Sequence, residues 1–242
     1  MQIPSQTIGI LGGMGPNASA DFLRRMLRMC SKCFGAVQDD DFPRIVLNSI
    51  NLSGFSVEGT KNLASVAHQL ISGIQVLEKA GAQIIAIPCN TVHCCYEAMT
   101  AATNVPILHI ADVAAEAVSK TGIKKVGLCS TSTTVQMRLY ETACAAFGIE
   151  IIIPSSDDQA ILNAVIESVM AEQNGEEELL ALKSVILALQ RKGAEGAILG
   201  CTELPLVINQ KWTDVPLFDS LELLAERTVK IAYMETIAVS LY

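Results

Sequence analysis

Eight short apolar runs alternate with longer amphipathic segments along the chain, and this alternation is the strongest constraint on its fold. A short apolar run suits a buried β-strand, whereas apolar residues spaced three and four apart suit a helix. The segment 59–80 shows the helical pattern, with Leu63, Leu70 and Leu77 on one stripe and Gly81 at its end. Alternating strands and helices predict an α/β fold with parallel sheets and right-handed crossovers.

The predicted strands are the short apolar runs, and they lie at 6–11, 44–50, 83–88, 106–109, 124–129, 149–153, 195–200 and 215–218. The predicted helices lie between them, at 17–33, 59–80, 91–103, 111–121, 132–147, 157–172, 175–192 and 219–240.

Composition narrows the class of protein. Half of the residues are apolar and 17% are charged, which suits parallel sheets that are covered by helices on both faces. No uncharged apolar run reaches the roughly 18–20 residues of a membrane span, and the first residues lack the basic region of a signal peptide. A net charge of -8 argues against nucleic acid or anionic membranes as partners. Eight cysteines without a signal peptide indicate a cytoplasmic protein with free thiols.

A weak internal repeat divides the chain into two similar halves. The segment 8–13 resembles 126–131, and the segment 84–91 resembles 196–203. Each half therefore has a first strand with a glycine- or threonine-bearing loop, and a later strand that ends in cysteine and polar residues. Two such halves facing each other predict a small-molecule site at their interface.

The two cysteines at the ends of the later strands, Cys89 and Cys201, are the strongest candidates for chemistry. Ligands of parallel sheets bind outside the carboxyl ends of the strands, and a helix N-terminus lowers the pKa of a thiol. We expect Asn90, Thr91 and Thr202, with neighbouring backbone N–H groups, to bind a carboxylate. The alternative is that both cysteines are buried structural residues.

The first loop, at 12–17, is a second candidate for ligand binding, and Met14 and Gly15 are its predicted contacts. Its glycines allow the backbone to approach a ligand, and the helix that follows favours an anion. The segment 13–18 also fits the dinucleotide pattern G-x-G-x-x-A. That alternative requires an acidic residue at the end of the second strand, where 48–51 reads Asn-Ser-Ile-Asn.

A metal site is not predicted near Cys89. His93, Cys94 and Cys95 follow it closely, but no second His/Cys cluster is near them in the sequence. We expect His93 to orient the Cys89 thiol instead.

Three segments resemble the signatures of the aspartate/glutamate racemase family: IGILGGMGPNASADFLRRM at 8–26, AIPCNTVH at 86–93 and GAILGCTELPLVI at 196–208. The resemblance covers nearly the whole chain. It implies two α/β domains related by a pseudo-twofold axis, with the last helix returning to the first domain. The implied boundaries are 1–110 plus 217–242 for the first domain and 111–216 for the second.

The resemblance also implies a reaction. Members of the family interconvert amino-acid enantiomers without pyridoxal phosphate or another cofactor, commonly as homodimers. Cys89 and Cys201 would be the base and the acid on opposite faces of the substrate's α-carbon, because a single base tends to return the proton to the face it left. Hydrogen-bond donors aimed at the substrate carboxylate would stabilise the developing carbanion.

The identity of the substrate follows from smaller matches. Thr131 and Thr134 match the family's threonine-bearing loop, although Ser and Thr there could equally cap a helix. Glu203 after the second cysteine resembles aspartate-type racemases, so aspartate is predicted, with glutamate as a second substrate. A first-turn Glu favoured by the helix dipole is the alternative for Glu203.

The chain departs from the family pattern at two places, and these departures leave open which substrate side chain it selects. Many aspartate racemases carry Asp-Arg-Thr after the second strand and a lysine at the end of a later helix. This chain has Asn51-Leu52-Ser53 and, at 169–172, no lysine. Asn51 and Ser53 are the predicted substitutes. Other reactions of the superfamily (hydantoin racemisation, maleate isomerisation, malonate decarboxylation) and non-catalytic binding of an amino acid or nucleotide remain alternatives.

Overall fold

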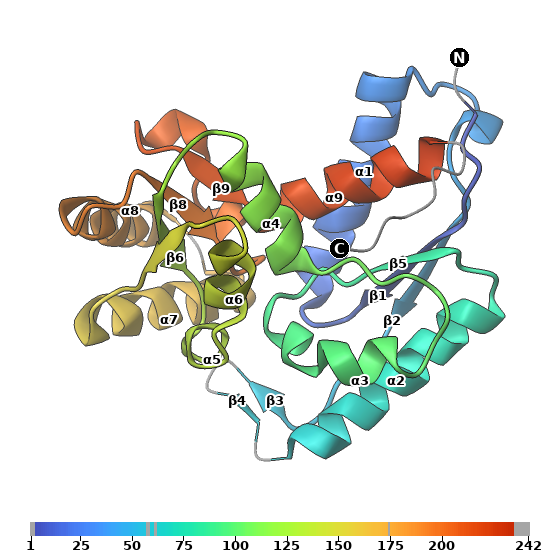
Figure 1. Cartoon of the computed structure of the whole chain (residues 1–242), viewed down its shortest axis with the longest axis horizontal. Coiled ribbons are helices and arrows are strands. Elements are labelled where there is room, and N and C mark those ends of the chain that lie inside the picture. The colour runs from blue at the N-terminus through green and yellow to red at the C-terminus, as the bar shows by residue number, and fades with distance from the viewer. Residues whose placement is uncertain (1–2, 57–58, 61, 174, 235–242) are drawn as a thin grey trace.

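The computed structural model describes residues 3–56, 59–60, 62–173 and 175–234, and it contains two parallel sheets covered by helices (Figure 1). The first sheet has the order β2-β1-β5 and the second the order β7-β6-β8-β9. A separate antiparallel pair, β3-β4, lies between β2 and α2 in the chain. The predicted α/β class with parallel sheets is confirmed.

The strands have the following bounds: β1 (Ile8–Gly12), β2 (Ile45–Ser49), β3 (Phe55–Ser56), β4 (Gly59–Thr60), β5 (Ile84–Ala86), β6 (Lys125–Cys129), β7 (Glu150–Ile152), β8 (Gly196–Leu199) and β9 (Leu217–Asp219). The α-helices are α1 (Pro16–Phe34), α2 (Leu63–Lys79), α3 (Tyr96–Thr100), α4 (Ile110–Ser119), α5 (Ser132–Gln136), α6 (Leu139–Ala145), α7 (Ser156–Met170), α8 (Glu176–Arg191) and α9 (Ser220–Tyr233).

The two sheets repeat one strand order. In each sheet the first strand of the half, β1 or β6, pairs on one side with the next strand along the chain. On its other side it pairs with β5 or β8, the strand that precedes Cys89 or Cys201. The two sheets differ at one edge. In the second sheet the strand β9 pairs with β8, whereas in the first sheet the equivalent position next to β5 holds a single parallel bridge between Ile85 and Ile107. The repeat in the sequence is therefore a repeat of topology, as the pseudo-twofold arrangement requires.

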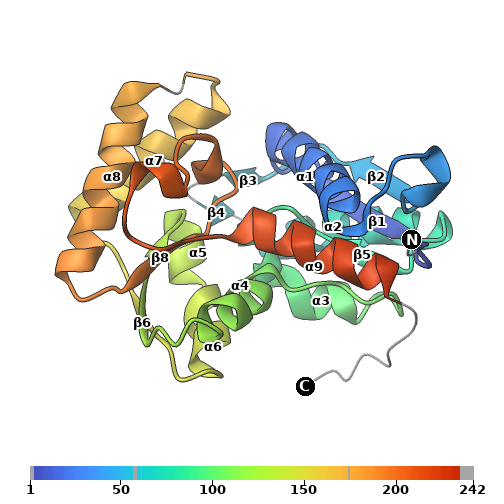
Figure 2. The ribbon, with the colours of Figure 1, turned by 90° about the horizontal axis from the view of Figure 1, so that it is seen from above.

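Helices cover both faces of each sheet (Figure 2). On the first sheet, Ile8 and Ile10 of β1 pack in one apolar cluster with α1 and α9, while Leu11 packs in another with α2. On the second sheet, α7 and α8 lie on one face, and α4 and α6 lie on the other. Alternate residues of a strand point to opposite faces, so both faces must be apolar.

The last helix connects the halves. Strand β9 pairs with β8, so 217–219 belong to the second sheet, and the predicted boundary at 217 falls three residues too early. Helix α9 then leaves that sheet and packs against α1 and α4 (Figure 1). Asp219 caps the helix by accepting hydrogen bonds from the backbone N–H groups of Leu221 and Glu222, at 2.9 and 3.1 Å.

Several predicted elements differ in the structure. The predicted strand 106–109 is reduced to the single bridge at Ile107. The predicted helix 59–80 begins only at Leu63, because Asn62 caps it by accepting from Ser65 N at 3.0 Å. Before the cap, 59–60 form a short strand.

Three other helices are shorter or broken. The predicted helix 91–103 starts as a 3-10 turn, Thr91–Cys95, before α3. The predicted helix 132–147 divides into α5 and α6 at Arg138, whose φ of 53° is left-handed and cannot continue a helix. Helix α9 ends at Tyr233, and 235–240 of its predicted range lie outside the described residues. None of the helices found in the described parts of the chain has both the length and the apolar character needed to cross a membrane.

A matched pair of substitutions tests the packing of α9. Leu224 is fully buried between α9 and the first sheet, whereas Leu180 on α8 is 58% exposed. Leu224→Ala should lower the free energy of unfolding by about 2–5 kcal/mol because it leaves a cavity. Leu180→Ala should lower it by less than about 0.5 kcal/mol. Denaturant titration measures both, and equal losses would contradict the assigned packing.

Candidate active site

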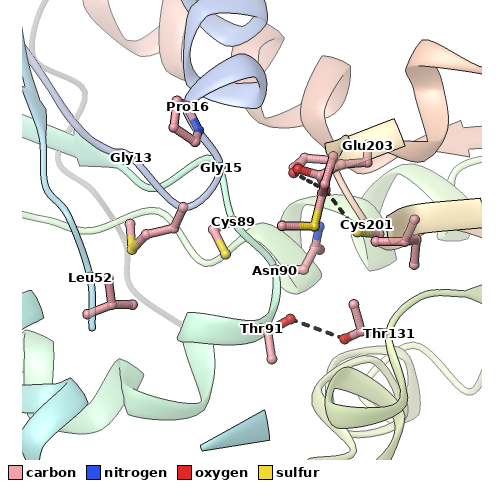
Figure 3. Close-up of a pocket in the computed structure, with 14 residues that line it drawn as sticks. Gly13, Gly15, Pro16, Leu52, Cys89, Asn90, Thr91, Thr131, Cys201 and Glu203 are labelled. Atoms are coloured by element: carbon pink, nitrogen blue, oxygen red, sulfur yellow. Dashed lines mark hydrogen bonds between the residues drawn. The ribbon is translucent and has the colours of Figure 1, made fainter. Parts of the chain in front are cut away.

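A cavity of about 210 Å³ lies between the two halves (Figure 3). Its size suits a free amino acid, since drug-sized ligands occupy roughly 300–1,000 Å³. The predicted site residues that line it are Met14, Gly15, Cys89, Asn90, Thr91, Thr131, Cys201, Thr202 and Glu203. Further lining comes from Gly13, Pro16, Leu52, Ile166 and Met170. The structure thus brings both cysteines to one cavity, each directly after the equivalent strand of its half.

Cys89 is held by the turn that follows β5. His93 Nε2 lies 3.3 Å from the backbone N–H of Ile110, which can only donate, so this nitrogen is the acceptor. The other ring nitrogen, Nδ1, therefore carries the proton and donates to the Cys89 carbonyl at 2.8 Å. Burial, together with the nearby His109, lowers the pKa of His93 to about 4, so the ring is neutral at neutral pH. His93 orients the backbone of Cys89 and not its thiol.

Cys201 is held by a carboxylate of its own turn. Its Sγ–H donates to Glu203 Oε2 at 3.0 Å, and the Thr202 hydroxyl donates to the same oxygen at 3.0 Å. The loop after β1, which belongs to the other half, lies close to the Glu203 carboxylate. A Cβ added at Gly15 would be 3.3 Å from Glu203 Oε1. Glu203 therefore lies in the interface as a side chain of the site, beside Cys201 in Figure 3.

Burial dominates the acidity of both thiols. It raises the pKa of Cys89 to about 12, against smaller lowering effects of the backbone N–H groups of Val92 and Thr91. It raises the pKa of Cys201 well above its usual range, and the charge of Glu203 and the hydrogen bond to it raise that pKa further. The expectation that helix N-termini would lower these pKa values is wrong, because the loss of water outweighs the few backbone donors.

The two cysteines are also electrostatically coupled. A charge on Cys89 raises the pKa of Cys201, and the charge of Glu203 raises the pKa of both thiols. Two like charges in one small cavity are strongly unfavourable. The site therefore favours at most one thiolate at a time, with Cys89 as the easier thiol to ionise.

Three buried threonines join the halves at the base of the cavity. The hydroxyl of Thr91 lies 3.2 Å from that of Thr131 and 2.9 Å from that of Thr134, and the last two lie 3.0 Å apart. Thr134 does not line the cavity; it supports the two that do. Thr131 also caps α5 by accepting from Thr134 N, so the alternative role of a helix cap is confirmed, and the same residue lines the cavity.

Asn90 belongs to a second buried chain across the interface. The Tyr140 hydroxyl donates to Asn90 Oδ1, and Asn90 Nδ2 donates to Ser220 Oγ at 3.2 Å. Ser220 in turn donates to the carbonyl of Leu199 at 2.7 Å, two residues before Cys201. These bonds set the orientation of the Asn90 amide and leave one of its two N–H groups for a ligand in the cavity.

Asn51 and Ser53 lie outside the cavity. Asn51 lines a separate hollow over α2. The backbone N–H of Ser53 donates to Gln69 Oε1 at 3.0 Å. Leu52 between them lines both this hollow and the cavity. Sequence reasoning also missed Ile166 and Met170, whose one-turn spacing on α7 carries no polar signal. Within the described residues, no cluster of metal-binding side chains occurs.

Two matching α/β halves, each placing one thiol at a shared cavity, define a class of protein that can hold a small molecule between two sulfur atoms. Residues 11–228 match the model of the Asp/Glu/hydantoin racemase family, and the chain belongs to that family.

Similar proteins agree with this assignment. The chain is 31% identical over 222 residues to the broad specificity amino-acid racemase RacX of Bacillus subtilis, covering 92% of this chain and 96% of that protein. It superposes with a TM-score of 0.80 on an aspartate racemase homologue from Pyrococcus horikoshii, at 30% identity over 94% of this chain and 99% of the other. The aspartate racemase of Picrophilus torridus gives a TM-score of 0.79 at 29% identity, with 94% of each chain covered.

The neutral state of His93 predicts a pH-dependent stability. Unfolding exposes a ring of pKa about 6.5, whereas the folded ring resists protonation until about pH 4. The unfolded state thus binds more protons between these values, and stability falls as the pH falls through this window. Relative to His93→Gln, which cannot titrate, the native chain should lose up to about 3 kcal/mol between pH 7 and pH 4. Denaturant unfolding across this range measures the difference, and parallel pH curves would contradict it.

Proposed function

We propose that this chain interconverts amino-acid enantiomers without a cofactor, with Cys89 and Cys201 as the two proton-transfer groups. The observation that carries the proposal is that equivalent strands of two similar halves deliver one thiol each to a single cavity. Racemisation needs one proton-transfer group on each face of the α-carbon, and one thiol from each half would meet that need.

The reaction proceeds by two proton transfers. A Cys89 thiolate removes the α-proton and becomes a thiol, and the electron pair left on the α-carbon delocalises into the α-carboxylate. The Cys201 thiol then donates its proton to the opposite face and becomes the thiolate. For the other enantiomer the two residues exchange roles. Before substrate binds, the hydrogen bond to Glu203 keeps Cys201 protonated, so Cys89 is the thiol that starts as the base.

The high pKa of the thiols suits this chemistry. The α-proton of an amino acid is a very weak acid, so a strongly basic thiolate reduces the free-energy gap of the transfer. A substrate ammonium group beside Glu203 would neutralise its charge and so lower the pKa of both thiols when the substrate binds. Binding of substrate would thereby generate the thiolate in place.

The polar groups of the cavity would hold the α-carboxylate. Asn90, Thr91 and Thr131 come from both halves and line the cavity, whereas the Thr202 hydroxyl already donates its proton to Glu203. Donors aimed at the carboxylate oxygens stabilise the charge that develops there as the α-proton leaves. Their buried hydrogen bonds keep them oriented before the substrate binds.

Several finer predictions stay proposals. The prediction of aspartate as the substrate depends on Glu203. Its side chain is negatively charged, so it cannot bind the second carboxylate of aspartate, and it accepts a hydrogen bond from the Cys201 thiol. A homodimeric, cytoplasmic enzyme is expected from the resemblance and the composition. A non-catalytic amino-acid-binding protein is the alternative from another class, and it would catalyse no exchange of the α-proton with solvent.

Single cysteine substitutions test the two-base assignment. Cys89→Ala and Cys201→Ala should each reduce racemisation by about 10³-fold or more, because each removes the proposed proton-transfer group on one face. Cys33→Ala, which removes an exposed thiol of α1, is the matched control and should keep native activity. Circular dichroism of the amino acid measures the rate. Native activity in either site variant would overturn the assignment.

The pH profile tests the role of Glu203. Because both thiols have raised pKa values, kcat/KM should increase about tenfold per pH unit from neutral pH toward pH 9. Glu203→Gln removes the charge that raises both pKa values, so its profile should shift to lower pH. Glu177→Gln in the first turn of α8 is the control and should leave the profile unchanged. A shift of the Glu203→Gln profile to higher pH would contradict this role.

A further inference from the structure

Apolar side chains form much of the cavity wall on both sides of the two sulfur atoms. Met14 and Leu52 pack against the apolar cluster that contains Cys89. Ile166 belongs to the cluster that contains Cys201, and Met170 lies one turn further along α7. In Figure 3, Leu52 lies on the Cys89 side of the cavity, away from Glu203. When the α-carbon of a substrate lies between the two sulfur atoms, its side chain therefore contacts these apolar residues.

No positive charge is built into this wall. Among the described residues that line the cavity, none is lysine, arginine or histidine, and the ionisable side chains are Cys89, Cys201 and Glu203. The polar donors suffice for one carboxylate, which the α-carboxylate of any amino acid occupies. A second carboxylate would lie against apolar side chains or beside Glu203, and burying such a charge without a partner is costly.

The three arginines of the neighbouring helix α1 are committed elsewhere, and the first of them, Arg24, pairs with Asp21. Arg25 bonds to Asp21 at 2.6 Å and to Glu222 at 2.9 Å, and it also pairs with Asp219. Arg28 pairs with Glu222 at 2.7 Å. These ion pairs join α1 to the start of α9, and the residues that form them do not line the cavity.

From this lining we propose that the substrates are amino acids with an uncharged, apolar side chain of about the size of leucine or methionine. The proposal rests on the proposed racemisation and specifies its substrate class. Met14 and Met170 are flexible and polarizable, so the wall can adapt to apolar side chains of different shape. Met170 is 54% exposed and lies at the end of α7, where it borders the opening between cavity and solvent.

A panel of single amino acids in deuterium oxide is the first arm of the test. Proton NMR measures the loss of the α-proton signal, and circular dichroism measures racemisation, for leucine, methionine, aspartate, glutamate and lysine. We expect kcat/KM for leucine and methionine to exceed that for aspartate and glutamate by about tenfold or more. Lysine tests whether Glu203 instead selects a positively charged side chain, and it should also react more slowly.

A charge introduced into the wall is the second arm. Met170→Lys keeps an apolar stem at the half-exposed position and adds a positive charge, so it should shift the ratio of aspartate to leucine turnover by about tenfold toward aspartate. Met170→Gln, which adds polarity without charge, is the matched control and should shift the ratio much less. The ratio is measured within each variant, so a general loss of activity does not affect it.

The outcomes separate the two proposals. Exchange of the α-proton that is fastest with leucine or methionine, together with the shift in Met170→Lys, supports the inference. Exchange that is fastest with aspartate, glutamate or lysine overturns it and leaves the two-thiol reaction standing. Absence of exchange with all five amino acids overturns the proposed function and this inference with it.

Discussion

A buried hydrogen-bond chain between the two halves underlies the whole site. Tyr140, Asn90, Ser220 and the carbonyl of Leu199 form one continuous path from α6 through the loop after Cys89 to the strand before Cys201. Both Tyr140 and Ser220 are fully buried, so water cannot replace a lost partner. An unsatisfied buried donor or acceptor costs about 1–3 kcal/mol, and this cost keeps the loop after Cys89 fixed against the strand that precedes Cys201.

The same burial determines the chemistry of the thiols. Removal of water raises the pKa of Cys89 and Cys201, which makes their thiolates rare but strongly basic. Glu203 adds to this effect and makes the two sites unequal. In the proposed reaction the substrate brings its own positive charge into the cavity, and the fold supplies the two sulfur atoms, the donors for one carboxylate and an apolar wall.

The sequence predicted the parts of this architecture that follow from local patterns. Apolar runs and their repeat predicted both sheets, and the position of cysteines after equivalent strands placed Cys89 and Cys201 at one interface. Tertiary contacts decided the rest. Nothing local shows that Arg138 breaks a helix, that β9 joins the second sheet, or that Leu52 rather than Asn51 enters the cavity. In the sequence, Ile166 and Met170 look like ordinary core or surface residues of a helix. They line a cavity only because the other half of the chain packs opposite them. The thiol pKa values were wrongly predicted, since burial is a property of the assembled fold.

The central claim is that two sulfur atoms face one α-carbon from opposite sides. A crystal structure of the native chain with a planar amino-acid analogue, whose central carbon is trigonal like the carbanion, tests it most directly. We expect the Sγ atoms of Cys89 and Cys201 on opposite faces of that carbon, each within about 4 Å. An analogue that contacts a single sulfur, or that has both sulfur atoms on the same face, would contradict it.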